Sequence, residues 1–177
     1  MKTILKFISV IIVLSQYSAI KADWPTYYTG LFETSYNEAT AIAVDNSGNS
    51  YVTGTAENDN PARMEVTTIK YSSSGVQQWV ARYSVAGTGL SIILSSDQEH
   101  VFVTGKISTT NQGWDFVTIK YYTSNGGQNW ANAYNGPGND DDVANKIVVD
   151  ASDNVYVTGR SIGDGTGNDF QLLNIII

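Results

Sequence analysis

The chain of 177 residues contains no cysteine, one histidine, and 17 acidic against 10 basic residues, for a formal net charge of −7. The absence of cysteine excludes disulfides, thiol chemistry and cysteine-ligated zinc sites. One histidine cannot supply a histidine metal cage or a repeated catalytic triad. Because lysines and arginines stand singly on an acidic chain, we expect no nucleic-acid partner.

Residues 1–22 have the pattern of a secretory signal peptide. Lys2 and Lys6 precede an apolar run that is broken by Ser15 and is shorter than the ~20 residues of a membrane-spanning helix. Ala22 is the expected last residue before cleavage, and an uncleaved anchor is the alternative. Cleavage would remove three lysines and no acid, and would leave an exported domain, 23–177, with a net charge of −10. We therefore expect a secreted or cell-envelope protein with no membrane span after cleavage.

The rest of the chain is a tandem repeat with a period of just over 50 residues. Tryptophans recur at spacings of 55 and 51 residues and the glycines of Thr-Gly pairs at spacings of 51 and 54. These residues are Trp24, Trp79, Trp130, Gly54, Gly105 and Gly159. Self-similarity at this period is typical of solenoids, propellers and arrays. It predicts units at about 24–83, 84–134 and 135–177.

Each unit contains short runs rich in Val, Ile, Thr, Tyr and Trp that are bounded by turn residues, which predicts β-strands. In the first unit the strands are expected at 40–45, 50–56, 66–72 and 77–83. Asp45-Asn-Ser-Gly48 between the first two is a turn sequence, so these strands should form a hairpin. Four antiparallel strands per unit with no helical periodicity favour a propeller blade.

Short sequence motifs recur in these units, and they resemble the bacterial β-propeller repeats of exported proteins known as SBBP repeats, over roughly residues 24–173. NHL-type propellers share one of these motifs at a shorter period and are a weaker relative. The resemblance implies an exported propeller protein. The residues that carry it are Ala41–Gly54, Thr67–Tyr71, Gly75–Trp79, Tyr28–Gly30 and Tyr134–Gly136.

Two departures from the repeat limit the expected architecture. In the second unit, residues 95–100 contain no glycine, so that hairpin must turn differently. In the third unit, residues 171–177 end the chain where a fourth strand is due, while residues 24–28 resemble a fourth strand without its blade. We predict an all-β fold, a propeller-like array of about three four-stranded antiparallel blades that is open or incomplete. It would be an open arc, a homo-oligomeric ring, or part of an array that continues into further blades.

The candidate site residues lie in two loops. Asp140, Asp141 and Asp142 are the densest acidic cluster, and they are interpreted as Ca²⁺ ligands, as a solvated acidic loop, or as catalytic carboxylates. Trp114 has no counterpart in the other units and is the aromatic residue expected to contact a ligand. By contrast, one tryptophan per unit in the same phase indicates a core position.

Other polar residues have plainer explanations. Asp45 and Asp150 are expected to cap turns. His100 is expected in a turn, with no special role. No catalytic group and no cofactor-binding residue stand out, so the leading hypothesis is a non-enzymatic module that binds an extracellular protein or glycan through its loops or a sheet edge. The alternatives are a carbohydrate-active hydrolase or lyase, and a truncated piece of a larger propeller protein.

Overall fold

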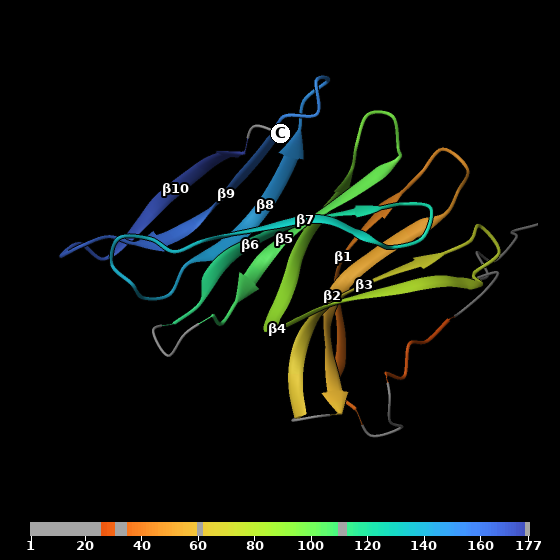
Figure 1. Ribbon diagram of the computed structural model, residues 1–177, viewed down its shortest axis with the longest axis horizontal. Coiled ribbons are helices and arrows are strands. Elements are labelled where there is room, and N and C mark those ends of the chain that lie inside the picture. The colour runs from red at the N-terminus through yellow and green to blue at the C-terminus, as the bar shows by residue number, and fades with distance from the viewer. Residues whose placement is uncertain (1–25, 31–34, 60–61, 110–112, 176–177) are drawn as a thin grey trace, which may run out of the picture.

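The computed structural model describes residues 26–30, 35–59, 62–109 and 113–175. This part of the chain is all-β, without a helix, and forms two antiparallel sheets, neither of them closed (Figure 1). One sheet has seven strands in the order β1 to β7, and the other has three in the order β10-β9-β8. The strands are β1 Asn37–Val44, β2 Ser50–Asp59, β3 Ala62–Tyr71, β4 Gln77–Leu94, β5 His100–Ile107, β6 Asp115–Tyr122, β7 Gln128–Tyr134, β8 Val143–Val149, β9 Val155–Ile162 and β10 Asn168–Ile175.

The expected signal peptide and Trp24 lie outside the described residues. The expected strand at residues 24–28 is not formed by its described part, since Thr26–Tyr28 have no strand pairing. No helix long and apolar enough to cross a membrane occurs in the part of the chain that the structure describes.

Strand β4 differs most from the expected strand boundaries. Its 18 residues run through the expected unit boundary at residue 83 without a break. Residues 77–86 pair with β3 and residues 87–94 pair with β5, so β4 is shared by two successive groups of four strands. Ser84-Val85-Ala86-Gly87 contains no Pro, Asn or Asp to start a turn, and the strand therefore continues.

The hairpin turns follow the expected pattern in the first and third units. The Asp45 carboxylate accepts hydrogen bonds from the backbone N–H groups of Ser47 and Asn49, both at 2.9 Å, and Gly48 has a positive φ. Asp150 makes the same contacts with the N–H groups of residues 152 and 154. In the second unit the turn closes one residue later, from Ser95 to His100, with Gln98 at positive φ.

The recurring Thr-Gly pair is explained by a close backbone approach. A β-bulge interrupts the first strand of each unit, and the glycine lies opposite it. A Cβ atom at Gly54, Gly105 or Gly159 would lie about 2 Å from the carbonyl oxygen of Glu38, Thr88 or Val143, respectively. Only glycine fits where the two backbones approach this closely, so the repeated glycine indicates a repeated bulge.

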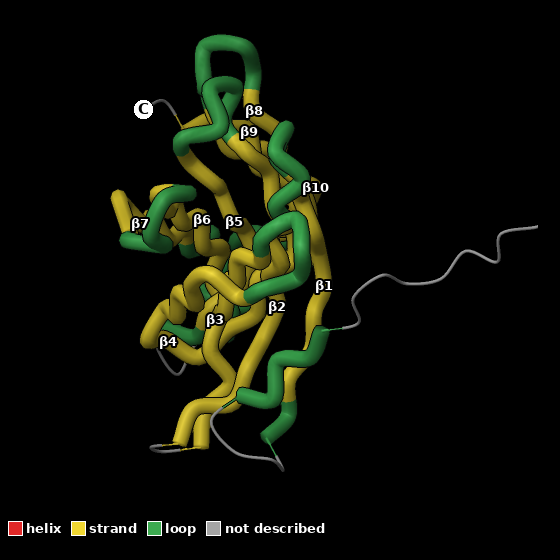
Figure 2. The backbone as a smooth tube through the Cα atoms, turned by 90° about the vertical axis from the view of Figure 1, so that its right-hand side faces the viewer, coloured by secondary structure: helices red, strands yellow, loops and turns green. Residues whose placement is uncertain are grey.

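Two hydrophobic contacts join the units, and they are built alike. In the first contact, Tyr51, Val66 and Trp79 of the β1–β4 strands pack against residues of the β4–β7 strands. In the second, Phe102, Phe116 and Trp130 pack against the three-stranded sheet. Figure 2 shows the backbone of that sheet, β8 to β10, next to β5. The residues on the other side are Ile92, Val101, Val103, Ile119 and Tyr121 in the first contact, and Ala144, Ile147, Val155, Val157 and Leu173 in the second.

The sequence Thr-Ile-Lys-Tyr occurs at 68–71 and again at 118–121, and it places side chains on both faces of its strand. In the first unit the Thr68 hydroxyl lies 3.2 Å from that of Thr53, and the Lys70 ammonium lies 5.2 Å from the centre of the Tyr51 ring. In the second unit Thr118 and Lys120 make the same contacts with residues 104 and 102. Ile119 and Tyr121, on the other face of that strand, are buried in the first contact. The alternation explains why all four residues of this sequence recur.

We expect Gly105→Ala to lower the free energy of unfolding by about 1–3 kcal/mol, because the added methyl group collides with the backbone of β4. Gly167→Ala is the matched control, since a Cβ atom there meets nothing within 4 Å. Urea denaturation monitored by tryptophan fluorescence measures both. Equal stability of the two variants would contradict the close-approach explanation.

Candidate functional site

Trp114 lies in a loop, as expected, immediately before β6, and its backbone is held on both sides. Its N–H donates to Asp141 Oδ1 at 3.1 Å, and its carbonyl oxygen accepts from the N–H of Asp142 at 2.5 Å. Gly113, with a φ of 106°, packs against the backbone of Asp140 and Asp141. The structure therefore brings together the two loops that the sequence singled out.

The three aspartates before β8 have different environments. Asp140 is exposed and its carboxylate accepts from the N–H of Asp141 at 2.8 Å, while Asp141 is half-buried against Trp114. Asp142 is fully buried and accepts from the N–H groups of Gly136 at 2.5 Å and Ile162 at 3.3 Å. Asp142 thus fixes the loop, and the other two carboxylates lie nearer the surface.

Lys106, near the end of β5, completes the arrangement and was missed by the sequence analysis. Its ammonium lies 4.5 Å from the centre of the Trp114 ring, within cation–π range. The pairing of β5 with β6 is the feature that could have located it, because Lys106 lies opposite Phe116, two residues beyond Trp114. We call Lys106, Trp114, Asp140 and Asp141 the Trp114 cluster.

Among the described residues, no three acidic or histidine side chains come together to hold a metal ion. The carboxylates of Asp140, Asp141 and Asp142 each accept from a different backbone N–H group. The calcium site stays a prediction.

The remaining polar candidates have structural partners. Both carboxylate oxygens of Asp150 accept hydrogen bonds, and the one from the Asn154 side chain contributes most to lowering the Asp150 pKa. At Asp45 burial raises the pKa, but hydrogen bonds from Asn49, Tyr51 and Ser47 outweigh it and lower the pKa overall. These contacts support the turn-capping interpretation of both residues.

His100 does not lie in a turn as expected; it is the first residue of β5. There it pairs with Tyr122 of β6, and their ring centres are 5.0 Å apart. The backbone hydrogen bond that closes the longer turn extends β5 to this residue.

Trp79 is buried in the first contact, as expected of a core tryptophan, and Trp130 packs at the second. The Trp79 indole N–H donates to the carbonyl oxygen of Thr123, in the turn after β6, at 3.0 Å. The buried Trp130 indole nitrogen has no hydrogen-bond partner in the described structure. The equivalent turn would follow β10, which ends at Ile175.

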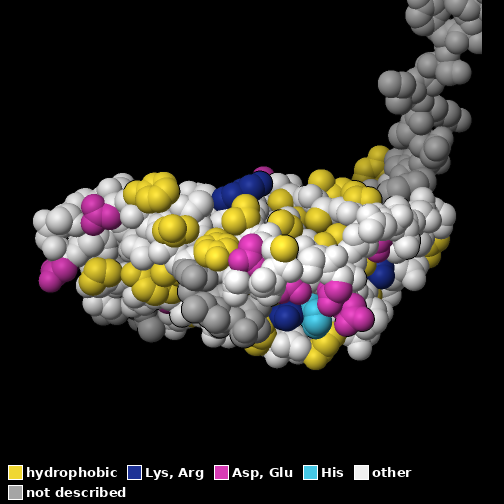
Figure 3. All heavy atoms as spheres, turned by 90° about the horizontal axis from the view of Figure 1, so that it is seen from above, with side chains coloured by type: hydrophobic (Ala, Val, Ile, Leu, Met, Phe, Trp, Pro, Cys, Tyr) yellow, Lys and Arg dark blue, Asp and Glu magenta, His cyan; other side chains and the backbone are white. Residues whose placement is uncertain are grey.

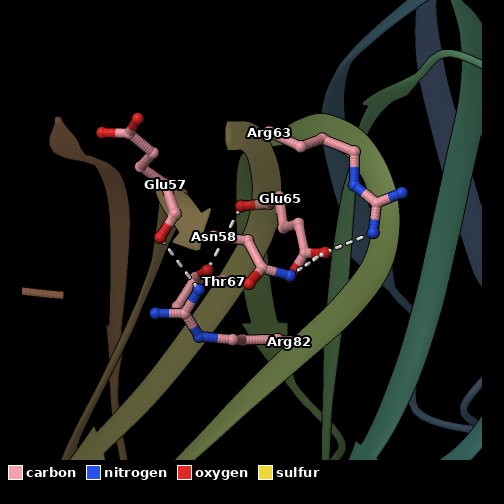
Figure 4. Close-up of polar contacts among 6 residues, drawn as sticks. All are labelled: Glu57, Asn58, Arg63, Glu65, Thr67 and Arg82. Carbon is pink, nitrogen blue, oxygen red and sulfur yellow. Dashed lines mark hydrogen bonds and ion pairs between the residues drawn. The ribbon is translucent and has the colours of Figure 1, made fainter. Parts of the chain in front are cut away.

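A third set of acids occupies one position in each unit, in the first half of the third strand. Glu65 is buried and accepts from Arg63 Nη2 at 2.6 Å and from the Asn58 side chain at 2.8 Å (Figure 4). Asp115 accepts from the Thr109 hydroxyl and Asp169 from the Thr166 hydroxyl. Each acid closes its own hairpin.

Two cavities lie on the outer faces of the terminal strand groups. One, of about 380 Å³, is lined by side chains of β1–β3 and by Tyr27 and Tyr28, and Glu38 is the one acidic residue among its described lining residues. The other lies on the three-stranded sheet beside Arg160 and Phe170, and Asp169 is the one acid among its described lining residues. The described lining of neither cavity therefore contains the pair of carboxylates that glycoside cleavage requires.

No protein-family model matches the chain, and a search of curated proteins likewise finds no match.

We expect Asp142→Ala to lower the free energy of unfolding by about 2 kcal/mol, because it leaves the buried N–H groups of Gly136 and Ile162 without an acceptor. Asp140→Ala, at an exposed position, should change it by less than about 0.5 kcal/mol. Chemical denaturation distinguishes them, and an unchanged Asp142→Ala variant would show that the carboxylate does not hold the loop.

Proposed function

We propose that this chain is a non-enzymatic, exported glycan-binding module with a propeller-type arrangement of four-stranded units, and that the Trp114 cluster is its binding surface. The observation that carries this proposal is the contact between the Trp114 loop and the Asp140–Asp142 loop. Two connecting segments that are far apart in the sequence thereby present an aromatic ring and two carboxylates at one end of the strands, and Lys106 of β5 adds a cation there.

The composition of the cluster favours a sugar as its ligand. The face of an indole ring packs against the C–H groups of a pyranose, and carboxylates accept hydrogen bonds from the sugar's hydroxyl groups. Trp114 is half-buried and Asp140 is exposed, so part of each is accessible. Because the backbone of Trp114 is held by the Asp141 side chain and the Asp142 N–H, little ordering cost accompanies binding.

The chemistry of the cluster also favours binding over catalysis. The Asp141 carboxylate accepts a hydrogen bond from one backbone N–H group, and the buried Asp142 carboxylate accepts from two. The cluster therefore has no opposed pair of carboxylates that could flank a substrate. Support for the propeller-type arrangement comes from the shared strand β4 and from the two similar contacts between units. Rigid sheets that carry loops are a common scaffold for recognition.

We expect the purified protein to bind at least one of a panel of neutral oligosaccharides built from glucose, galactose, mannose or N-acetylglucosamine, and Trp114→Ala to weaken this binding by at least about tenfold. Isothermal calorimetry measures the affinity. Tyr122→Ala is the control, since it removes an exposed aromatic residue next to the turn after β6, away from the cluster.

Full affinity in Trp114→Ala, or no binding of any oligosaccharide in the panel, would contradict the proposed function. Cleavage of the oligosaccharide during the measurement would contradict the non-enzymatic part of it.

A further inference from the structure

The same face of the repeat unit is buried twice in this molecule and exposed once. Ile92 is 8 % exposed in the first contact and Ile147 is 2 % exposed in the second, but Ile42, at the same position of the first unit, is 63 % exposed. We call this open surface of the β1–β4 strands the leading face. It consists of Ile42, Val44, Val52, Ile69 and Tyr71, which the strand register places on one side of the sheet.

The opposite face shows the same pattern at the other end of the molecule. Phe116 is 1 % exposed in the second contact, whereas Phe170, which follows the same aspartate in the third unit, is 84 % exposed. This open surface of the three-stranded sheet is the trailing face, and Figure 3 shows hydrophobic side chains exposed at that end of the molecule. It consists of Val148, Tyr156, Phe170 and Leu172.

Residues near the N-terminus already occupy part of the leading face. Tyr28 lines the cavity there together with Ile69 and Tyr71. Tyr28 and Tyr83 each follow a tryptophan by four residues, and Tyr83 packs at the first contact. Burial and Tyr28 raise the pKa of Tyr71, just as burial and Tyr83 raise the pKa of Tyr121. Tyr28 thus lies where the outer strand of a preceding unit would lie.

The three-stranded sheet, in turn, has no outer strand among the described residues. β10 pairs with β9 on one side only, so its other edge is open. Tyr28 lies at the position of an outer strand although Thr26–Tyr28 form no strand pairing, and the described part of the three-stranded sheet lacks an outer strand. Each supplies what the other lacks.

The charges of the two open surfaces are also of opposite sign. Glu38 is the charged residue among the described residues that line the cavity of the leading face. Arg160 and Lys146 are exposed on the strands of the trailing face, and Arg160 lines the cavity there together with Asp169. Contact between the two faces therefore places basic groups near an acidic one.

We propose that two copies of this chain associate head to tail, with the trailing face of each covering the leading face of the other, to close a ring of six four-stranded sheets. Each copy contributes two groups of four strands and the three-stranded sheet, which the segment around Tyr28 of the other copy completes. Three sheets are too few for a closed propeller, six lie within the usual four to eight, and nine exceed it. The contact repeats the two that already join the units within one copy.

The proposal rests on the propeller-type arrangement and not on the Trp114 cluster, so it is tested without any ligand. Analytical ultracentrifugation of the purified chain should give the mass of two copies. Ile42→Glu, on the leading face, and Leu172→Arg, on the trailing face, should each give monomers. Both side chains are more than half exposed, so the changes leave the folded copy intact. Val76→Glu, at an exposed apolar residue outside both faces, should remain a dimer.

Mixing the two monomeric variants distinguishes head-to-tail association from other arrangements. In the mixed pair one contact is unaltered, and the other brings the new glutamate and the new arginine to the same interface, so the dimer should return. A monomeric or open-ended polymeric wild-type chain would overturn the proposal. A dimer that persists in either single variant, or a mixture that stays monomeric, would overturn it as well.

Discussion

The fold depends on one contact between successive strand groups, which is made twice. Aromatic residues on one face, with Trp79 and Trp130 at its outer strands, pack against branched aliphatic residues on the next. A single four-stranded sheet buries little on its own, and repeats of this kind gain a core only by stacking. Without cysteine, no disulfide can substitute for this burial.

The backbone is arranged to permit that contact. Bulges at the start of each unit and the glycines opposite them bring neighbouring strands close to one another, and the long strand β4 carries the chain from one group to the next without a loop. The repeated aspartate turns hold the opposite ends of the strands. Hydrogen bonds also link successive units there, as from the N–H and hydroxyl groups of Ser96 to Asp153. The repeated sequence motifs therefore correspond to repeated contacts.

Much of the architecture could be predicted from the sequence because its signals are local. The hairpin at Asp45–Gly48 and the phase of the tryptophans follow from turn chemistry and period. The continuity of β4 could not be predicted, because it depends on which strands pair on each side of residue 86. His100 was misplaced for a similar reason, since a pairing partner on β6 extends the strand to it.

Trp114 and Asp140–Asp142 were each predicted separately. Lys106 was missed although the β5–β6 hairpin register places it close to Trp114. The contact between the two loops depends on the stacking of one strand group on another, which no local pattern encodes.

The stacking of the strand groups also determines the open surfaces of the molecule. It places the loops of the Trp114 cluster, and it leaves the two outermost faces exposed.

The central claim is that the β4–β7 group is sandwiched between the other two. Hydrogen–deuterium exchange followed by mass spectrometry tests it directly. Strand β5 is paired along both edges and has Val101 and Val103 buried in one contact and Phe102 in the other. Its amides should therefore exchange most slowly, far more slowly than those of the edge strand β7. Exchange in β5 as fast as in β7 would contradict the account.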